Sequence, residues 1–176
     1  MERSAAFWLT LAFLNAKNAF EDPLAAAHWW GGVRNGAFEA LPLAGAPKPR
    51  FDSALAAELR KLQTAALETV GELTRGGRPS EASVAIVSGA LRRGTMQLHG
   101  TPPAVAYSVD EGAAAVLFPL ALAIASLIAA DLSRLRRCAN EPCAAYFWDA
   151  TKNGSRRWCG LPCMERARAP RRRLRR

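Results

Sequence analysis

The middle of the chain carries hydrophobic residues at the spacing of two amphipathic helices. Apolar side chains recur every three or four residues across 53–74, where Asp52 or Ser53 can cap the first turn and two glycines end the pattern. A second helix is expected to start near Ser80 and to run to about Leu91. The expected buried positions are Leu55, Leu59, Leu62, Ala66 and Val70 in the first helix and Ala82, Ala85, Ile86, Gly89 and Ala90 in the second.

The segments on either side of these helices complete a mainly helical domain. Residues 1–38 are apolar and aromatic and should form core helices, whereas 41–50, with three prolines and a glycine, should be an extended linker. Two short runs at 95–99 and 105–109, separated by Gly-Thr-Pro-Pro, predict a β-hairpin. The fold class predicted is therefore mainly α (α+β). The aromatic residues expected in the core are Phe7, Trp8, Phe13, Trp29 and Trp30.

Two hydrophobic segments have some features of membrane or export elements. Residues 113–130 form an uncharged run of eighteen, which just reaches the length of a membrane span, but the run is rich in alanine and Pro119 interrupts it. A helix buried on most sides fits this composition better. Residues 5–16 resemble the apolar part of an export signal, but Glu2 opposes the single positive charge of Arg3 before them. We therefore expect a cytoplasmic protein with no membrane partner.

Charge divides the chain into two parts. Residues 1–130 hold eleven basic and eleven acidic side chains, whereas 131–176 hold thirteen basic and four acidic ones. Twelve of those thirteen are arginine, whose guanidinium forms paired hydrogen bonds with phosphate oxygens. We expect a helical domain over 1–131 and a basic module over 132–176 whose partner is nucleic acid.

The four cysteines all lie within the basic module. They are Cys138, Cys143, Cys159 and Cys163, spaced as C-x4-C, fifteen residues and C-x3-C. Two close pairs joined by a loop suit tetrahedral zinc, and four thiolates leave no open position, so we expect a structural Zn²⁺. Two disulfides, a redox pair or an iron–sulfur cluster are the alternatives. Disulfides are uncommon in the cytosol, which favours metal.

Aromatic and basic residues surround the cysteines. Residues 146–148 with Trp158 should form an apolar floor beside the metal, although aromatic rings could instead stack on bases. A short helix is expected over 164–169, ended by Pro170. The predicted nucleic-acid contacts are Arg156, Arg157, Arg166, Arg168, Arg171, Arg172 and Arg173.

These residues resemble the bacterial CGNR zinc-finger family. The motif residues that match in order are Cys138, Cys143, Phe147, Asp149, Thr151, Arg156, Arg157, Trp158, Cys159 and Cys163, with Arg166 at the final position. The C-G-N-R signature itself reads Cys163-Met164-Glu165-Arg166 here, which places a negative charge where the family has a neutral amide. The run LTLAFLNA over 9–16 resembles the start of the helical ABATE domain of that family. The resemblance implies a stress-related transcriptional regulator that binds DNA.

Three classes of function remain open from the sequence. The first is a DNA-binding regulator whose helical domain senses a small-molecule effector or forms a homodimer, and the second is an RNA- or ribosome-associated protein. In the third, the helical domain itself binds or converts a small molecule, with a candidate pocket at Asn15, His28 and Trp29 and a further histidine, His99. A lone histidine near tryptophans is more often a packed core residue, and no set of nucleophile, base and orienting group surrounds it. We therefore expect that the protein is not an enzyme.

Overall fold

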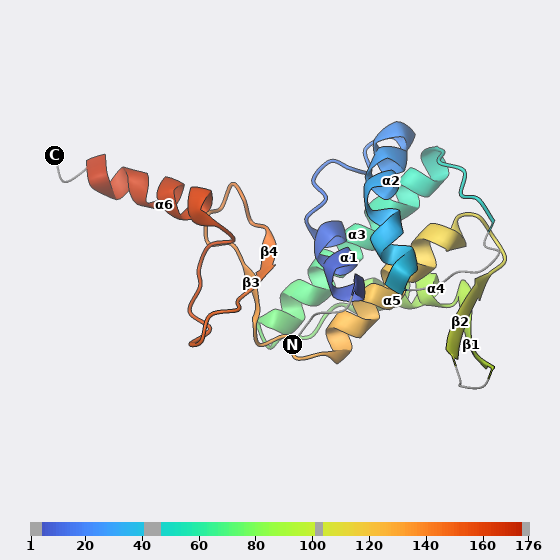
Figure 1. Ribbon diagram of the computed structural model, residues 1–176. Coiled ribbons are helices and arrows are strands. Elements are labelled where there is room, and N and C mark those ends of the chain that lie inside the picture. The colour runs from blue at the N-terminus through green and yellow to red at the C-terminus, as the bar shows by residue number, and fades with distance from the viewer. Residues whose placement is uncertain (1–4, 41–46, 101–103, 174–176) are drawn as a thin grey trace. The chain divides into compact units, whose positions relative to one another are not determined.

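The computed structural model describes residues 5–40, 47–100 and 104–173 (Figure 1). These fall into two compact units, Met1–Ala130, here called the helical unit, and Asp131–Arg176, here called the cysteine unit. The predicted fold class is confirmed, because helices dominate and two small hairpins accompany them. The elements of the helical unit are α1 (Ala5–Leu14), α2 (Pro23–Ala40), α3 (Ser53–Thr74), α4 (Glu81–Leu91), β1 (Gly94–His99), β2 (Ala104–Val109) and α5 (Ala114–Ala129).

Helices α3 and α4 begin at side chains that cap them. Asp52 accepts a hydrogen bond from the Leu55 N–H at 2.9 Å, and Ser80 accepts one from the Ser83 N–H at 3.2 Å. Each cap occupies one of the N–H groups that a helix leaves unpaired in its first turn. Asp52, rather than Ser53, therefore fixes the start of α3. All five positions predicted to be buried in α3 are buried.

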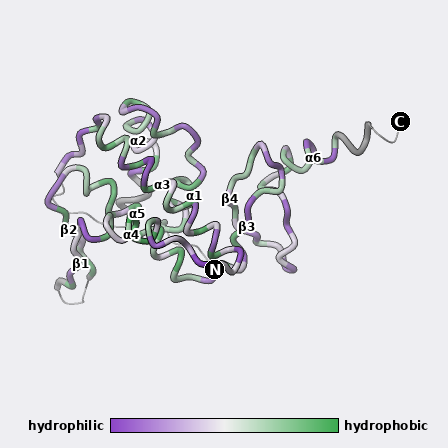
Figure 2. Tube along the Cα trace, turned by 180° about the vertical axis from the view of Figure 1, so that it is seen from behind, coloured by the Kyte–Doolittle hydropathy of each residue, from purple (hydrophilic) through white to green (hydrophobic). Residues whose placement is uncertain are grey.

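Helix α5 lies in the centre of the core. It packs against α1, α3 and α4 and buries most of its length, with Val116 and Ile124 fully inaccessible. Figure 2 shows the hydrophobic character of this helix. The prediction of a core helix is confirmed, but Pro119 does not interrupt it, since the helix continues from Ala114 to Ala129. Within the described residues, no helix is both long and apolar enough to cross a membrane.

Two details of the predicted core are wrong. In α4 the buried residues are Val87 and Ala90, whereas Ala82 and Ala85 are exposed. This helix has small or apolar residues all around its circumference, so periodicity alone does not select the face that meets α3 and α5. Trp8 is 56% exposed, and its ring meets the edge of the Phe7 ring instead of entering the core.

The predicted hairpin is confirmed as an antiparallel pair of β1 and β2. Its base packs on α5, where the Tyr107 and Phe118 rings lie 6.0 Å apart and Val109 is buried beside them. Hydroxyl groups of Thr95 and Ser108 share a hydrogen bond of 2.6 Å across the strands. Of the predicted linker, 41–46 lies outside the described residues, and 47–50 has no regular structure.

The cysteine unit contains a second hairpin and one helix. Strands β3 (Leu135–Arg137) and β4 (Tyr146–Trp148) pair antiparallel, and helix α6 spans Leu161–Arg173. The helix predicted over 164–169 is therefore too short at both ends. It begins near the fourth cysteine, and Pro170 does not end it, because a proline removes one backbone hydrogen bond without always breaking a helix.

Candidate metal centre and nucleic-acid interface

The fold brings the four cysteine thiols to one point. Cys138 follows β3, Cys143 closes the next turn, Cys159 precedes α6 and Cys163 lies in the first turn of α6. All four Sγ atoms lie within 4.8 Å of one another, and Cys143 and Cys163 each lie 3.6 Å from Cys159. A tetrahedron with Zn–S bonds of about 2.3 Å has edges of about 3.8 Å. The sulfur positions therefore suit zinc, and none of the four thiols forms a disulfide.

Backbone hydrogen bonds shape the turn between the first two cysteines. The Asn140 carbonyl accepts the N–H groups of Cys143 and Ala144, at 2.8 and 3.0 Å, and Ala144 takes a left-handed conformation with φ of 49°. The Asn140 side chain donates to Cys163 Sγ at 3.6 Å, which links the two cysteine pairs. Ala139 N–H also donates to the Arg157 carbonyl at 2.8 Å. These contacts hold the turn and link the two cysteine pairs.

Two of the thiols, those of Cys143 and Cys159, have pKa values shifted in opposite directions. A backbone hydrogen bond from Ala145 lowers the pKa of Cys143 to about 7, whereas burial and the neighbouring sulfur atoms raise the pKa of Cys159 to about 12. Four thiolates this close repel one another, and a divalent cation compensates their charge. Zinc with four thiolate ligands is closed to water and substrate, so its role here is structural. The cofactor predicted from the spacing is confirmed.

An apolar floor supports the cluster. Phe147 is buried with Cys138 and Cys163, and Trp158 packs against the same group. The predicted floor is confirmed for these two aromatic residues. Trp148, at the end of β4, is only partly buried.

A fully buried carboxylate organises the loop between β4 and the second cysteine pair. Asp149 accepts hydrogen bonds from the Thr151 N–H at 2.9 Å, the Thr151 hydroxyl at 2.5 Å and the Arg156 N–H at 2.7 Å. Burial alone would raise the pKa of Asp149, but the hydrogen bonds from Thr151 and Arg156 outweigh it and lower the pKa. In the sequence, Asp149 stands out only as a member of the zinc-finger motif. The spacing Asp-x-Thr, which is typical of a side-chain-capped turn, could have indicated this role.

Several arginines of the unit bind its own backbone. Arg134 donates to the carbonyls of Thr151 and Lys152, and Arg136 donates to the Gly154 carbonyl at 3.2 Å. Arg156 donates to the carbonyls of Trp158 and Cys159, at 2.9 and 2.5 Å. Its guanidinium also lies 5.4 Å from the centre of the Phe147 ring. Arg156 thus supports the metal-binding loop, a function that the sequence did not indicate.

Other arginines from separate segments meet at one tryptophan. The Cζ atoms of Arg157 and Arg168 lie 5.4 and 5.8 Å from the centre of the Trp158 ring. Arg157 comes from the loop before Cys159 and Arg168 from α6, and both are exposed. Arg166 is also exposed on α6. The remaining predicted contacts, Arg171, Arg172 and Arg173, lie in α6, but their side chains are outside the described part.

The cysteine unit is similar to one known family. Residues 134–176 match the family model of the CGNR zinc finger. The matched range includes all four cysteines and all thirteen basic residues of the cysteine unit. It does not include the helical unit, so the resemblance of that unit to ABATE stays a prediction. Comparison of the chain with curated proteins finds no match.

The residues of the predicted effector pocket lie in α2 and in the turn between α1 and α2, and the pocket itself stays a prediction. Trp29 packs against Phe13 and Phe20, with ring centres 5.7 and 5.0 Å away, in an aromatic cluster of α1 and α2. His28 is exposed, so it is not the packed core residue that the sequence favoured. Asn15 is partly buried in the turn after α1. A cavity of about 520 Å³ lies elsewhere in the helical unit, between α3 and α4. The side chain of His99 is outside the described residues.

Proposed function

We propose that this protein is a DNA-binding transcriptional regulator in which the zinc-bound cysteine unit contacts DNA and the helical unit regulates it. The distribution of charge supports this proposal, because the whole excess of positive charge is in the cysteine unit. A unit with this excess of positive charge attracts the phosphates of a DNA duplex, and the duplex releases counterions when the unit binds.

The convergence of Arg157 and Arg168 on Trp158 is the observation that carries the proposal. Two guanidinium groups held near one ring repel each other, and a phosphate placed between or beside them would offset that repulsion. The ring orders both side chains through cation–π contacts, which reduces the entropy lost when they bind. Trp158 lies directly before the zinc ligand Cys159, so the metal fixes the position of this basic pair.

In this proposal the arginines of the cysteine unit have two different roles. Arg156 is held by the carbonyls of Trp158 and Cys159 and acts as a support for the loop. Arg157, Arg166 and Arg168 are the contacts to phosphate, with Arg171, Arg172 and Arg173 extending the same helix. Glu165 lies among them on α6, and its negative charge disfavours phosphate at that one position.

We propose no catalytic activity for the cysteine unit. A zinc ion with four thiolate ligands has no position for water or substrate, so it does not activate either. In this proposal the helical unit supplies regulation, through a bound effector or through pairing with a second copy. The site of action is then the cytoplasm, and the proposed cellular role is a response to stress.

Fluorescence anisotropy with the full zinc-loaded chain tests this proposal. We expect the double variant Arg157→Ala, Arg168→Ala to bind a mixed-sequence duplex at least tenfold more weakly, and its log–log salt slope to fall by roughly 2, since each lost phosphate contact removes about 0.9. The matched control is Arg34→Ala, Arg78→Ala, which removes the same charge from exposed positions of the helical unit.

Two outcomes count against the proposal. Equal losses in the test and control variants would mean that net charge alone governs binding and that the Trp158 site has no specific role. Binding of single-stranded RNA in preference to the duplex would assign the unit to RNA instead, because the same arginines can serve either polymer.

A further inference from the structure

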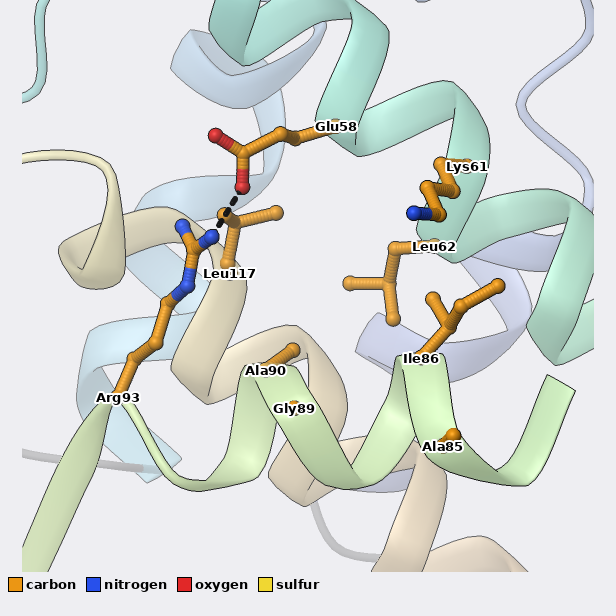
Figure 3. Close-up of a pocket in the computed structure, with 9 residues that line it drawn as sticks. All are labelled: Glu58, Lys61, Leu62, Ala85, Ile86, Gly89, Ala90, Arg93 and Leu117. Carbon is orange, nitrogen blue, oxygen red and sulfur yellow. Dashed lines mark ion pairs between the residues drawn. The ribbon is translucent and has the colours of Figure 1, made fainter. Parts of the chain in front are cut away.

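The cavity between α3 and α4 has the size and lining of a site for a small molecule. Its volume is about 520 Å³, within the range of about 300 to 1,000 Å³ that is usual for ligand pockets. Figure 3 shows α3 along one side and α4 along the other. The cavity lies wholly within the helical unit, so its existence does not depend on the zinc site.

The floor of the cavity is apolar and belongs to the core of the unit. Leu62 of α3, Ala90 of α4 and Leu117 of α5 are all buried, and each contributes to the lining. Small residues on α4 keep the space open. A Cβ placed on Gly89 would meet only the Arg92 guanidinium, at 3.9 Å, so nothing on the opposite helix occupies the volume beside it.

The rim of the cavity carries three charged side chains. Glu58 and Arg93 form an ion pair of 2.5 Å that joins α3 to the end of α4 (Figure 3). Lys61 lies one helical turn after Glu58 on α3 and also lines the cavity. Two cations against one carboxylate leave a net charge of +1 at the rim, and Lys61 is the cation outside the ion pair. The rim therefore favours an anion, and the floor favours an apolar group.

We propose that this cavity binds a small hydrophobic carboxylate. The apolar body lies on Leu62 and Leu117, and the carboxylate meets Lys61, with Arg93 nearby. Such a ligand places each of its parts against a matching surface, whereas a cation would meet two like charges. This inference goes beyond the proposed function and holds whether the cysteine unit binds DNA, RNA or neither.

Calorimetric titration of the full zinc-loaded chain with octanoate tests the proposal, with octylammonium and 1-octanol as probes of equal length and different charge. We expect octanoate to bind saturably, 1-octanol to bind roughly tenfold more weakly and octylammonium not to bind. Lys61→Glu should weaken octanoate binding at least tenfold. Lys48→Glu reverses a charge at an exposed position outside the cavity and should leave binding unchanged.

A second variant separates loss of the cavity from loss of the fold. Gly89→Leu places a side chain beside the open space and improves helix propensity, so we expect octanoate binding to be lost while the melting temperature stays the same or rises. Failure of octanoate to bind the unmodified chain overturns the proposal. Equal binding by the unmodified chain, Lys61→Glu and Gly89→Leu also overturns it, because the ligand then lies elsewhere. A preference for octylammonium would show that Glu58 selects the ligand and would refute an anion site.

Discussion

Two nearby glycines of the helical unit should respond in opposite ways to the same substitution by alanine. A Cβ on Gly94, at the start of β1, would lie 2.5 Å from the Cγ atom of Phe118, far inside contact distance. Phe118 is buried with Val109 and cannot move aside without disturbing the packing of the hairpin on α5. A Cβ on Gly89, inside α4, would have its nearest neighbour at 3.9 Å.

The expected sizes follow from these contacts. Gly89→Ala should stabilise the unit by about 0.5–1 kcal/mol, because glycine inside a helix costs that much relative to alanine. Gly94→Ala should cost about 1–3 kcal/mol through overpacking, offset by about 0.5 kcal/mol from the smaller entropy of the unfolded chain. At roughly 4 °C for each kcal/mol, the melting temperature should rise by about 2–4 °C for Gly89→Ala, and the net cost of about 0.5–2.5 kcal/mol should lower it by about 2–10 °C for Gly94→Ala.

Thermal unfolding of the zinc-loaded chain, followed by far-ultraviolet circular dichroism, measures both changes. The double variant Gly94→Ala, Phe118→Leu should be less destabilised than the sum of the two single variants, because the smaller leucine side chain leaves room for the new methyl group. If Gly94→Ala leaves the melting temperature unchanged or raises it, as Gly89→Ala should, the close packing of β1 on Phe118 is wrong.

Further predictions concern the cysteine unit. The Asp149→Asn variant should release zinc to a chelator faster than the Asp131→Asn variant, which carries the same change at an exposed site. Asp149, unlike Asp131, holds the loop before the second cysteine pair. The pKa of Asp149 is lowered in the fold. The stability that its carboxylate contributes is therefore fully present above the unfolded pKa of about 3.9 and is lost only as the pH falls through the folded pKa. The difference in zinc-release rate between the two variants should therefore be constant over roughly pH 6 to 8. Arg156→Ala should speed zinc release with a secondary loss of DNA binding, whereas Arg157→Ala should weaken DNA binding and leave zinc release unchanged. Cys163→Ser should lower the zinc content measured by mass spectrometry well below one ion per chain, while the thermal transition of the helical unit stays in place.

Local features of the sequence explain why much of the fold was predictable. Asp52 and Ser80 cap α3 and α4 through hydrogen bonds to residues only three positions further along the chain, and two short runs separated by Gly-Thr-Pro-Pro predict the hairpin. The buried face of α4 was not predictable in the same way, because it depends on how α3 and α5 approach a helix with apolar residues on every side. The exposure of Trp8 likewise depends on tertiary packing, since hydrophobicity alone favours its burial.

At the metal site, too, one part could be predicted from the sequence and another could not. The ligands follow from residue type and spacing, because a closed zinc site takes four ligands, two close pairs of cysteines supply them, and the chain has no other cysteines. The role of Arg156 could not be read in this way. A pair of arginines beside a cysteine looks like a phosphate contact in the sequence, and only the folded loop directs one guanidinium to the Trp158 and Cys159 carbonyls and the other to the Trp158 ring.

Binding of duplex DNA should depend on the zinc content of the chain, measured as zinc is withdrawn and restored. If the metal positions Arg157 and Arg168 at Trp158, binding at fixed salt should fall in proportion to the zinc removed by a chelator and should return when one equivalent of zinc is added. Undiminished binding by the zinc-free chain would show that the metal does not position these arginines, because the basic residues would then act as an unstructured charge.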